Sequence, residues 1–180
     1  MRLIAGQWRG RPLDAPAGDT TRPTSDRARE GLFSMLASRL GSFDGLAVAD
    51  LFAGTGALGL EALSRGAASC TFVEKDRTAL DILKRNVERL GAGEKADIRA
   101  QAVEHAPPPA RPYDLILMDP PYGAGLAQPA LDHAAAWLVP GGWLSLEVHG
   151  ESPALPAGLE LDTERRFGKA TLKLIRRPAA

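Results

Sequence analysis

The amino-acid sequence predicts an α/β fold with a Rossmann-like, mostly parallel sheet of seven strands. Short apolar segments alternate with segments of helical periodicity, which is the pattern of repeated strand–helix units. Residues 159–166 and 170–175 alternate between apolar and polar side chains and predict an antiparallel C-terminal hairpin. Residues 50–59 form a glycine-rich stretch between an apolar segment and a helical one. Such a stretch is typical of a turn that holds a nucleotide-like cofactor at a helix N-terminus.

The composition is that of an ordinary globular protein with one main domain. The 180 residues are 44% hydrophobic and carry 22 basic and 22 acidic side chains, so the formal net charge is zero. Residues 1–40 and residues 160–180 each sum to +3, and the residues between them sum to −6. Basic ends suit the binding of a polyanion, although ordinary surface charge explains them slightly better.

Several features favour a cytoplasmic protein. No apolar run approaches the roughly 20 residues that cross a bilayer, and residues 1–6 lack the apolar core of a signal peptide. Cys70 is the only cysteine, which excludes an intramolecular disulfide and a cysteine metal cluster. Its place in a predicted strand indicates a small buried side chain.

The N-terminal residues 2–16 are expected to form a small β-hairpin. Trp8, Arg9 and Arg11 lie at its bend and suit nucleic-acid binding through stacking and phosphate pairing. A solvated hairpin with Trp8 packed on the domain is about as well supported. We expect residues 1–20 to form an RNA-contacting extension and residues 21–180 to form the main domain.

The remaining elements follow in order along the chain. A helix begins near Asp26 and ends near Leu40, with its apolar stripe facing inward and Arg27 and Arg29 pointing elsewhere. The expected central strands are residues 46–52, 68–73, 96–102, 113–118 and 143–148, and the expected helices are residues 57–65, 77–90 and 129–138. Residues 140–142, Pro-Gly-Gly, predict a turn before the fifth strand.

Two candidate cofactor contacts follow the first two strands. The spacing Gly54-x-Gly56-x-x-Gly59 alone also fits a dinucleotide site. Glu74 ends the second strand, 20 residues after Gly54, where its carboxylate can accept both hydroxyls of a ribose. The alternative is a surface acid that precedes a helix.

The tetrapeptide Asp119-Pro120-Pro121-Tyr122 directly follows the buried fourth strand. Its two prolines fix the backbone, so that a carboxylate, a rigid carbonyl and an aromatic face stand together at the strand tip. Asp119 and the Pro120 carbonyl can accept the two hydrogens of an amino group while Tyr122 stacks on its ring. This arrangement suits attack by the amino nitrogen on an electrophile, without metal or covalent catalysis. A proline-rich turn with an incidental tyrosine is the alternative.

These motifs, in this order, resemble the S-adenosylmethionine-dependent amino-methyltransferases, which have a Rossmann-like class I fold. The segments Trp8-Arg9-Gly10-Arg11, Arg22-Pro23-Thr24-x-Asp26-Arg27-x-Arg29-Glu30 and Phe52 to Arg65 resemble, more narrowly, the bacterial RsmD family. That family methylates N2 of a guanine in 16S ribosomal RNA. The chain departs from the family in its short, proline-rich connection at residues 105–112 and in its short C-terminus.

The resemblance implies a role for each matched residue. Asp119, Pro120 and Tyr122 would grip the guanine, and Asp50 would bind the amino group of S-adenosylmethionine directly or through water. The other implied cofactor contacts are Phe52, Ala53, Gly54, Gly56, Glu74, Lys75, Gln101, Ala102 and Thr24. The implied RNA contacts are Trp8, Arg9, Arg11, Arg22 and Arg27. The resemblance further implies no metal, a monomer, and 16S ribosomal RNA within assembling 30S subunits as the partner.

Four rival functions remain for comparison. An adenine-N6 DNA methyltransferase shares the Asp-Pro-Pro-Tyr motif, but it usually carries a target-recognition region for which this chain has no room after Asp119. A protein-glutamine methyltransferase usually has asparagine in place of Asp119. A dinucleotide-binding oxidoreductase would need a second half-domain or a substrate domain. A binding-only ribosome-assembly factor would not need the intact tetrapeptide.

Overall fold

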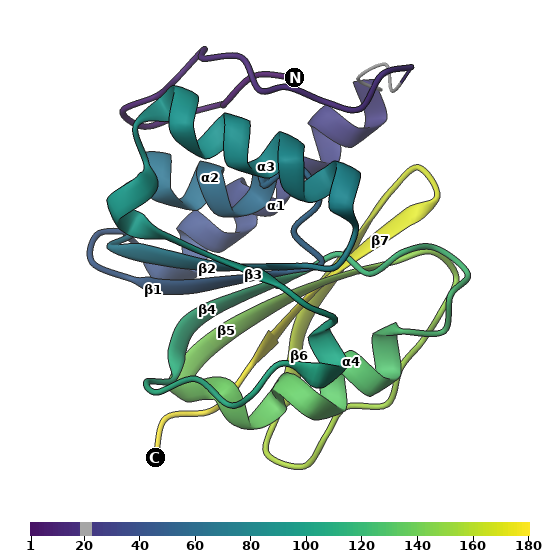
Figure 1. Cartoon of the computed structure of the whole chain (residues 1–180). Coiled ribbons are helices and arrows are strands. Elements are labelled where there is room, and N and C mark those ends of the chain that lie inside the picture. Colours follow the sequence, from purple (N-terminus) through teal and green to yellow (C-terminus); the bar gives the residue numbers. More distant parts are fainter. Residues whose placement is uncertain (19–22) are drawn as a thin grey trace.

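The computed structural model describes residues 1–18 and 23–180 and contains one seven-stranded sheet (Figure 1). The strand order is β3-β2-β1-β4-β5-β7-β6. Strands β1 to β5 are parallel to one another, and β7 is antiparallel to both of its neighbours, β5 and β6. The strands are β1 (Ala47–Leu51), β2 (Ser69–Glu74), β3 (Ala96–Ala100), β4 (Tyr113–Met118), β5 (Leu138–Val148), β6 (Glu160–Phe167) and β7 (Ala170–Arg176). The predicted α/β sheet with an antiparallel C-terminal hairpin is therefore confirmed.

Helices cover both faces of the sheet. The helices are α1 (Pro23–Leu40), α2 (Ala57–Ser64), α3 (Arg77–Leu90) and α4 (Ala127–Ala134), with short 3-10 turns at Gly93–Lys95, Val103–His105 and Ala135–Trp137. Helices α1, α2 and α3 lie on one face and α4 on the other (Figure 1). The chain reverses its winding at β1, between β2 and β4, so the carboxyl ends of these strands border the crevice where such sheets bind ligands.

Several boundaries differ from the sequence prediction, among them the start of β5 and both ends of α4. Residues 140–142, predicted as a turn, lie inside β5, because Gly141 adopts φ +82° and the strand bulges there instead of reversing. The Gly141 N–H donates to the Arg177 carbonyl and the Arg177 N–H donates to Gly142, so the bulged residues stay paired with the end of the chain. Helix α4 begins at Ala127, two residues before the predicted start, and Pro129 lies within its first turn.

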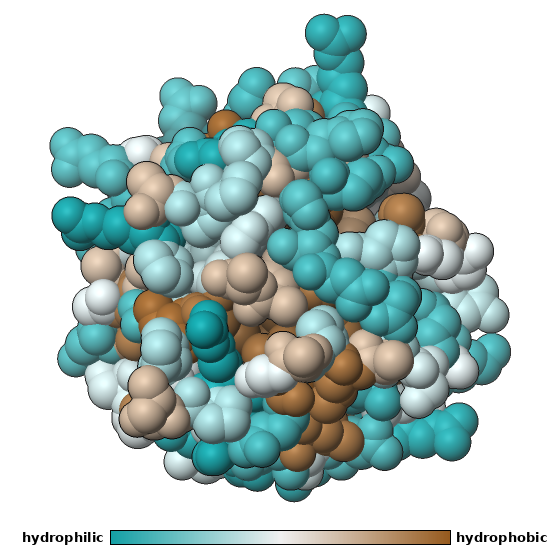
Figure 2. Space-filling model, turned by 90° about the horizontal axis from the view of Figure 1, so that it is seen from below, coloured by the Kyte–Doolittle hydropathy of each residue, from teal (hydrophilic) through white to brown (hydrophobic). Residues whose placement is uncertain are grey.

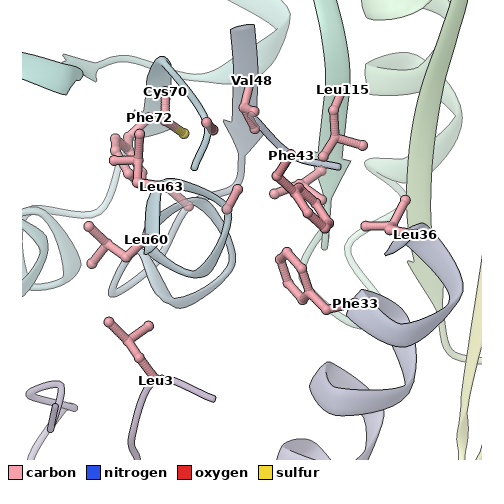
Figure 3. Close-up of a cluster of buried hydrophobic side chains, with 14 of the residues drawn as sticks. Leu3, Phe33, Leu36, Phe43, Val48, Leu60, Leu63, Cys70, Phe72 and Leu115 are labelled. Atoms are coloured by element: carbon pink, nitrogen blue, oxygen red, sulfur yellow. The ribbon is translucent and has the colours of Figure 1, made fainter. Parts of the chain in front are cut away.

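The core on the α1–α3 side joins all three helices to the sheet (Figure 3). Phe33 and Phe43 meet with ring centroids 5.7 Å apart, and Cys70 is buried among these side chains as the sequence predicted. A second core beneath the sheet packs α4 and Trp137 against Ile116 and its neighbours. Figure 2 looks at this α4 side, where apolar side chains gather in the middle of a hydrophilic surface. Among the described helices, none has both the length and the apolar character of a bilayer span.

The N-terminal hairpin is present and is docked firmly on α2. Reciprocal backbone hydrogen bonds between Leu3 and the Gly10–Arg11 segment form its antiparallel pairing. The fully buried Glu61 carboxylate accepts the N–H groups of Ile4 and Ala5 at 2.9 and 3.1 Å. Leu3 belongs to the core on the α1–α3 side, and the half-buried Trp8 packs against this core. The N-terminal residues therefore form part of the folded domain surface.

Gly59 allows α2 to approach the sheet closely. A Cβ added there would lie 2.4 Å from a ring carbon of Phe72 and 2.7 Å from the Cys70 sulfur, and both neighbours are fully buried. Gly59, the third glycine of the motif, therefore serves the packing of α2 against β2.

Substitution of Gly59 by alanine should therefore destabilise the protein. The added methyl overpacks the core between α2 and β2, so we expect Gly59→Ala to lower the free energy of unfolding by about 1–3 kcal/mol. Urea unfolding followed by circular dichroism measures this. Gly93→Ala is the matched control, because a Cβ at this exposed glycine meets nothing within 4 Å. Equal stability of the two variants would contradict the packing role.

Candidate active site

The loop after β1 has a strained backbone that is fixed from the neighbouring strand. Phe52 adopts φ +62°, which is rare for a residue with a side chain, and Gly54 adopts φ +56°. The Gly54 N–H donates to Oε1 of Glu74 at 2.8 Å. A Cβ at Gly54 would meet nothing within 4 Å. The backbone at Gly54 is therefore open to close approach by a ligand.

Glu74 is held in place and keeps capacity for a ligand. Its Oε2 accepts the Asp76 N–H at 2.8 Å, so each carboxylate oxygen has one backbone donor. Each oxygen can accept further hydrogen bonds. A carboxylate fixed by two N–H groups can thus receive the two hydroxyls of a ribose without first being reoriented.

A first cavity lies beside Glu74 at the tips of β2, β3 and β4. Its lining includes Phe52, Glu74, Lys75, Gln101 and Ala102, which the sequence assigned to the cofactor. The lining also includes Val73, Val103, Glu104, Asp119, Pro121 and Leu126. Of these, sequence reasoning missed Val73, Val103, Glu104 and Leu126 as site residues. The cavity has a volume of about 130 Å³.

Asp50, Ala53 and Gly56, which were also predicted to contact the cofactor, are not among the residues that line this cavity. Asp50 is 1% exposed, and its Oδ2 accepts the Gly59 N–H at 2.9 Å, which ties β1 to α2. Burial raises the pKa of Asp50 to about 8, and the nearby Glu74 adds to the rise. Ala53 is buried and donates to the Val73 carbonyl. Gly56, at φ +88°, faces the Leu83 side chain, so packing and backbone conformation both require glycine there.

The Asp119–Tyr122 turn directly follows β4. Pro120 is buried, whereas Tyr122 is 76% exposed and available for stacking. Solvent reaches Asp119 at the mouths of two cavities, yet protein surrounds it on most sides, and this desolvation raises its pKa well above the usual range. The carboxyl groups of Glu147 and then Asp50 add to the rise.

A second cavity lies between α1, the start of α2 and the tips of β4 and β5. Its lining is Met1, Asp26, Ala28, Arg29, Leu32, Ala57, Leu58, Met118, Asp119, Ser145, Glu147 and Leu172. Asp119 borders both cavities and therefore marks their junction. Sequence reasoning missed Glu147 as a site residue. An acidic residue inside the otherwise apolar strand 143–148 is the signal that could have found it.

The sequence prediction that Arg29 points away from the core is wrong. It is only 8% exposed, because its side chain runs under the N-terminal hairpin and donates to the Arg2 carbonyl at 2.6 Å. Its Nε and Nη1 have no hydrogen-bond partner among the described residues. Burial lowers its pKa, while Glu61 and Asp26 favour the charged form. A buried guanidinium with unsatisfied donors beside a cavity is suited to an anionic ligand group.

The predicted RNA-binding residues lie on the surface around the N-terminal hairpin and α1. Arg9, Arg11 and Arg27 are exposed, and Arg11 also donates to the Arg89 carbonyl at 2.8 Å. Arg22 and the side chain of Thr24 lie outside the described residues.

The fold of this chain is that of solved class I methyltransferases. Magnesium protoporphyrin IX methyltransferase from Synechocystis, solved with bound S-adenosylmethionine, shares the fold with a TM-score of 0.68, covering 89% of this chain and 86% of that one at 15% identity. The class of protein that the fold defines is therefore the class I methyltransferase fold.

The particular family follows from the sequence as a whole. The chain belongs to the family described as Conserved hypothetical protein 95, whose model matches residues 1–176. It is 37% identical over 187 residues to the ribosomal RNA small subunit methyltransferase D of Escherichia coli, covering 99% of this chain and 91% of the relative. The enzyme of the same name from Haemophilus influenzae is 35% identical over 181 residues, covering 97% and 92%. The solved Escherichia coli protein yhhF has a TM-score of 0.88 at 36% identity, covering 100% and 99%. The resemblance to the RsmD family is confirmed.

The raised pKa of Asp50 predicts a pH-dependent stability. Between about pH 4, near the ordinary aspartate pKa, and about pH 8, the native state keeps a proton that the unfolded chain has lost. The stability contributed by this group therefore falls as pH rises through that window and levels off above it. We expect Asp50→Asn to lack this loss, so its free energy of unfolding relative to the wild type should rise from pH 5 to pH 8. A constant difference across the urea-unfolding series would contradict the shift.

Proposed function

We propose that this protein transfers a methyl group from S-adenosylmethionine to the exocyclic N2 of a guanine in 16S ribosomal RNA. The observation that carries the proposal is the Asp119–Tyr122 turn at the junction of the two cavities. A carboxylate, a rigid carbonyl and an exposed aromatic ring stand there beside the cofactor site. The full-length similarity to ribosomal RNA small subunit methyltransferase D supports ribosomal RNA as the substrate.

The residues present fit the cofactor at both of its ends. The first cavity offers apolar walls for an adenine and the fixed Glu74 carboxylate for a ribose. At the second cavity, the unsatisfied Nε and Nη1 of Arg29 suit the carboxylate of the methionine part. Gly54, with open space beside its Cα, would let the chain between these ends pass close to the backbone. When bound, S-adenosylmethionine supplies an electrophilic methyl group on a positively charged sulfur.

The chain itself positions the acceptor for attack. Asp119 and the Pro120 carbonyl would accept the two amino hydrogens of guanine, which orients the nitrogen lone pair towards the methyl group. Tyr122, largely exposed, would stack on the base. Because the site is concave, a base within helical RNA has to be unstacked before it enters. Positioning and electrostatics supply the catalysis.

The partner and setting are part of the same proposal. Exposed Arg9, Arg11 and Arg27 lie on the hairpin and α1, the elements that border the second cavity, and suit contact with RNA phosphates. We propose that residues 1–20 contact RNA in this way and that residues 21–180 bind the cofactor. The acceptor is 16S ribosomal RNA in assembling 30S subunits, and the enzyme acts as a cytoplasmic monomer.

Incubation with labelled S-adenosylmethionine tests the proposed product. We expect label in 16S RNA or partly assembled 30S particles, and nucleoside analysis should give N2-methylguanosine. N6-methyladenosine would overturn the guanine assignment in favour of the adenine-N6 rival. Parallel assays of naked RNA and assembled particles determine which form is the substrate.

The Asp119→Ala variant tests the role of the turn in the same assay. Loss of the amino-group acceptor should abolish turnover, whereas the dissociation constant for S-adenosylmethionine, measured by calorimetry, should change far less. An active Asp119→Ala enzyme would contradict the proposed role of the turn.

Replacement of Arg29 tests the second end of the cofactor site. Arg29→Met keeps the volume and removes the charged donors, so we expect the dissociation constant for S-adenosylmethionine to rise about 10–100-fold, as loss of a hydrogen bond to a charged group predicts. Arg27→Met, on the exposed face of the same helix, is the control and should bind normally. Unchanged affinity in a folded Arg29→Met protein would exclude this carboxylate contact.

A further inference from the structure

Three titratable side chains gather at the tips of β4 and β5. One oxygen or nitrogen atom from each of Asp119, Glu147 and His149 lies within 4.8 Å of the other two. The strand pairing explains the cluster, because Met118 is opposite Leu146 and the next residue on each strand is therefore Asp119 and Glu147. Glu147 and His149, two residues apart, project from the same side of the chain.

Asp119 is exposed in the structure and would be covered by the bound base, so the cluster offers a polar route from the acceptor site through Glu147 to His149. Oε2 of Glu147 lies 3.3 Å from Nε2 of His149, and their side chains are 23% and 29% exposed. The His149 ring also meets Tyr122 edge-on, with ring centroids 5.6 Å apart at 84°. The route thus begins at Asp119, which would hold the amino group of the guanine. It ends at His149, which lies against Tyr122, the residue that would stack on the guanine.

The other charged groups around this route lie on different elements. Asp50, at the tip of β1, is fully buried and bound to the Gly59 N–H. Asp26 and Arg29 approach from α1 across the second cavity, which Glu147 and Asp119 also line. Among these described groups, His149 provides the Glu147 carboxylate with a neighbouring imidazole nitrogen, a group that can either donate or accept a hydrogen bond.

We propose that Glu147 and His149 carry the proton released by the reaction from Asp119 to solvent. This inference rests on the proposed transfer to an amino group, because such a transfer must release one proton. The nitrogen forms a bond to the methyl carbon, the carbon–sulfur bond breaks, and its electron pair stays on the neutral sulfur. The N–H proton moves to the Asp119 carboxylate. A proton then passes along Glu147 to Nε2 of His149, whose other ring nitrogen releases one to water.

The electrostatics of the pair agree with this geometry. A carboxylate beside Asp119 makes the Asp119 carboxyl harder to ionise. Glu147 accordingly contributes to the raised pKa of Asp119, after the larger effect of desolvation. A group with a raised pKa is a better proton acceptor at neutral pH than an ordinary aspartate.

Glu147→Gln tests the relay, because it keeps the size of the side chain and removes its proton-carrying carboxylate. We expect the single-turnover rate of methyl transfer to fall about 10–100-fold, at or below the lower end of the range for general acid–base groups. Without the Glu147 charge, the pKa of Asp119 falls, so the acid limb of the pH–rate profile should move to lower pH. Glu151→Gln, just beyond the cluster, is the control and should match the wild type.

Chemical rescue gives a second readout. In His149→Ala the rate should fall, and added imidazole should restore part of it, whereas imidazole should not restore Glu147→Gln. Calorimetry with S-adenosylmethionine establishes that each variant is folded and binds the cofactor. A wild-type rate and pH profile in Glu147→Gln would overturn the relay. If Glu147→Gln binds S-adenosylmethionine more weakly and the acid limb of its pH–rate profile does not move, the relay is overturned as well. Glu147 would then be assigned to cofactor binding.

The outcomes separate this inference from the proposed function. If wild-type enzyme forms N2-methylguanosine and Glu147→Gln behaves like it, the function stands and the relay fails. If the wild type methylates another amino group, the guanine assignment fails, and the same pH comparison still measures proton transfer from that acceptor.

Discussion

The hydrogen bond from the Gly54 N–H to the Glu74 carboxylate joins the tips of the two strands on which the cofactor site is built. It holds the loop after β1 in its left-handed conformation, next to the strained Phe52, and it fixes the orientation of the carboxylate. Asp50 secures the other end of the loop through the Gly59 N–H. Two acids on adjacent strands therefore shape the loop between them, and the first cavity takes its form from that loop.

Four carboxylates from four parallel strands meet around this centre: Asp50, Glu74, Asp119 and Glu147. Their mutual repulsion is visible in the pKa values of Asp50 and Asp119, each raised in part by another member of the group. Because Asp50 keeps its proton up to about pH 8, the group carries less negative charge near neutral pH than four acidic side chains would otherwise bring.

The parts of the site that depend on strand ends could be predicted from the sequence. Glu74 and the Asp119–Tyr122 turn follow buried strands directly, and parallel strands bring their carboxyl ends to one edge. The burial of Arg29 could not be predicted, because it depends on a hairpin that covers α1 from outside the helix. The pairing of Glu147 with Asp119 required the register of β4 and β5, and the bulge at Gly141 obscures that register in the sequence.

The docking of the N-terminal hairpin has a consequence for the order of folding. Ile4 and Ala5 bind Glu61, 57 and 56 residues away, and the Asp14 N–H donates to Asn86, 72 residues away. Closing such long loops costs chain entropy and slows folding. On a ribosome the hairpin emerges before its partners on α2 and α3, which follow only after much more chain has been made. The hairpin therefore cannot dock until those helices exist, and the wall that Met1 contributes to the second cavity is completed only then.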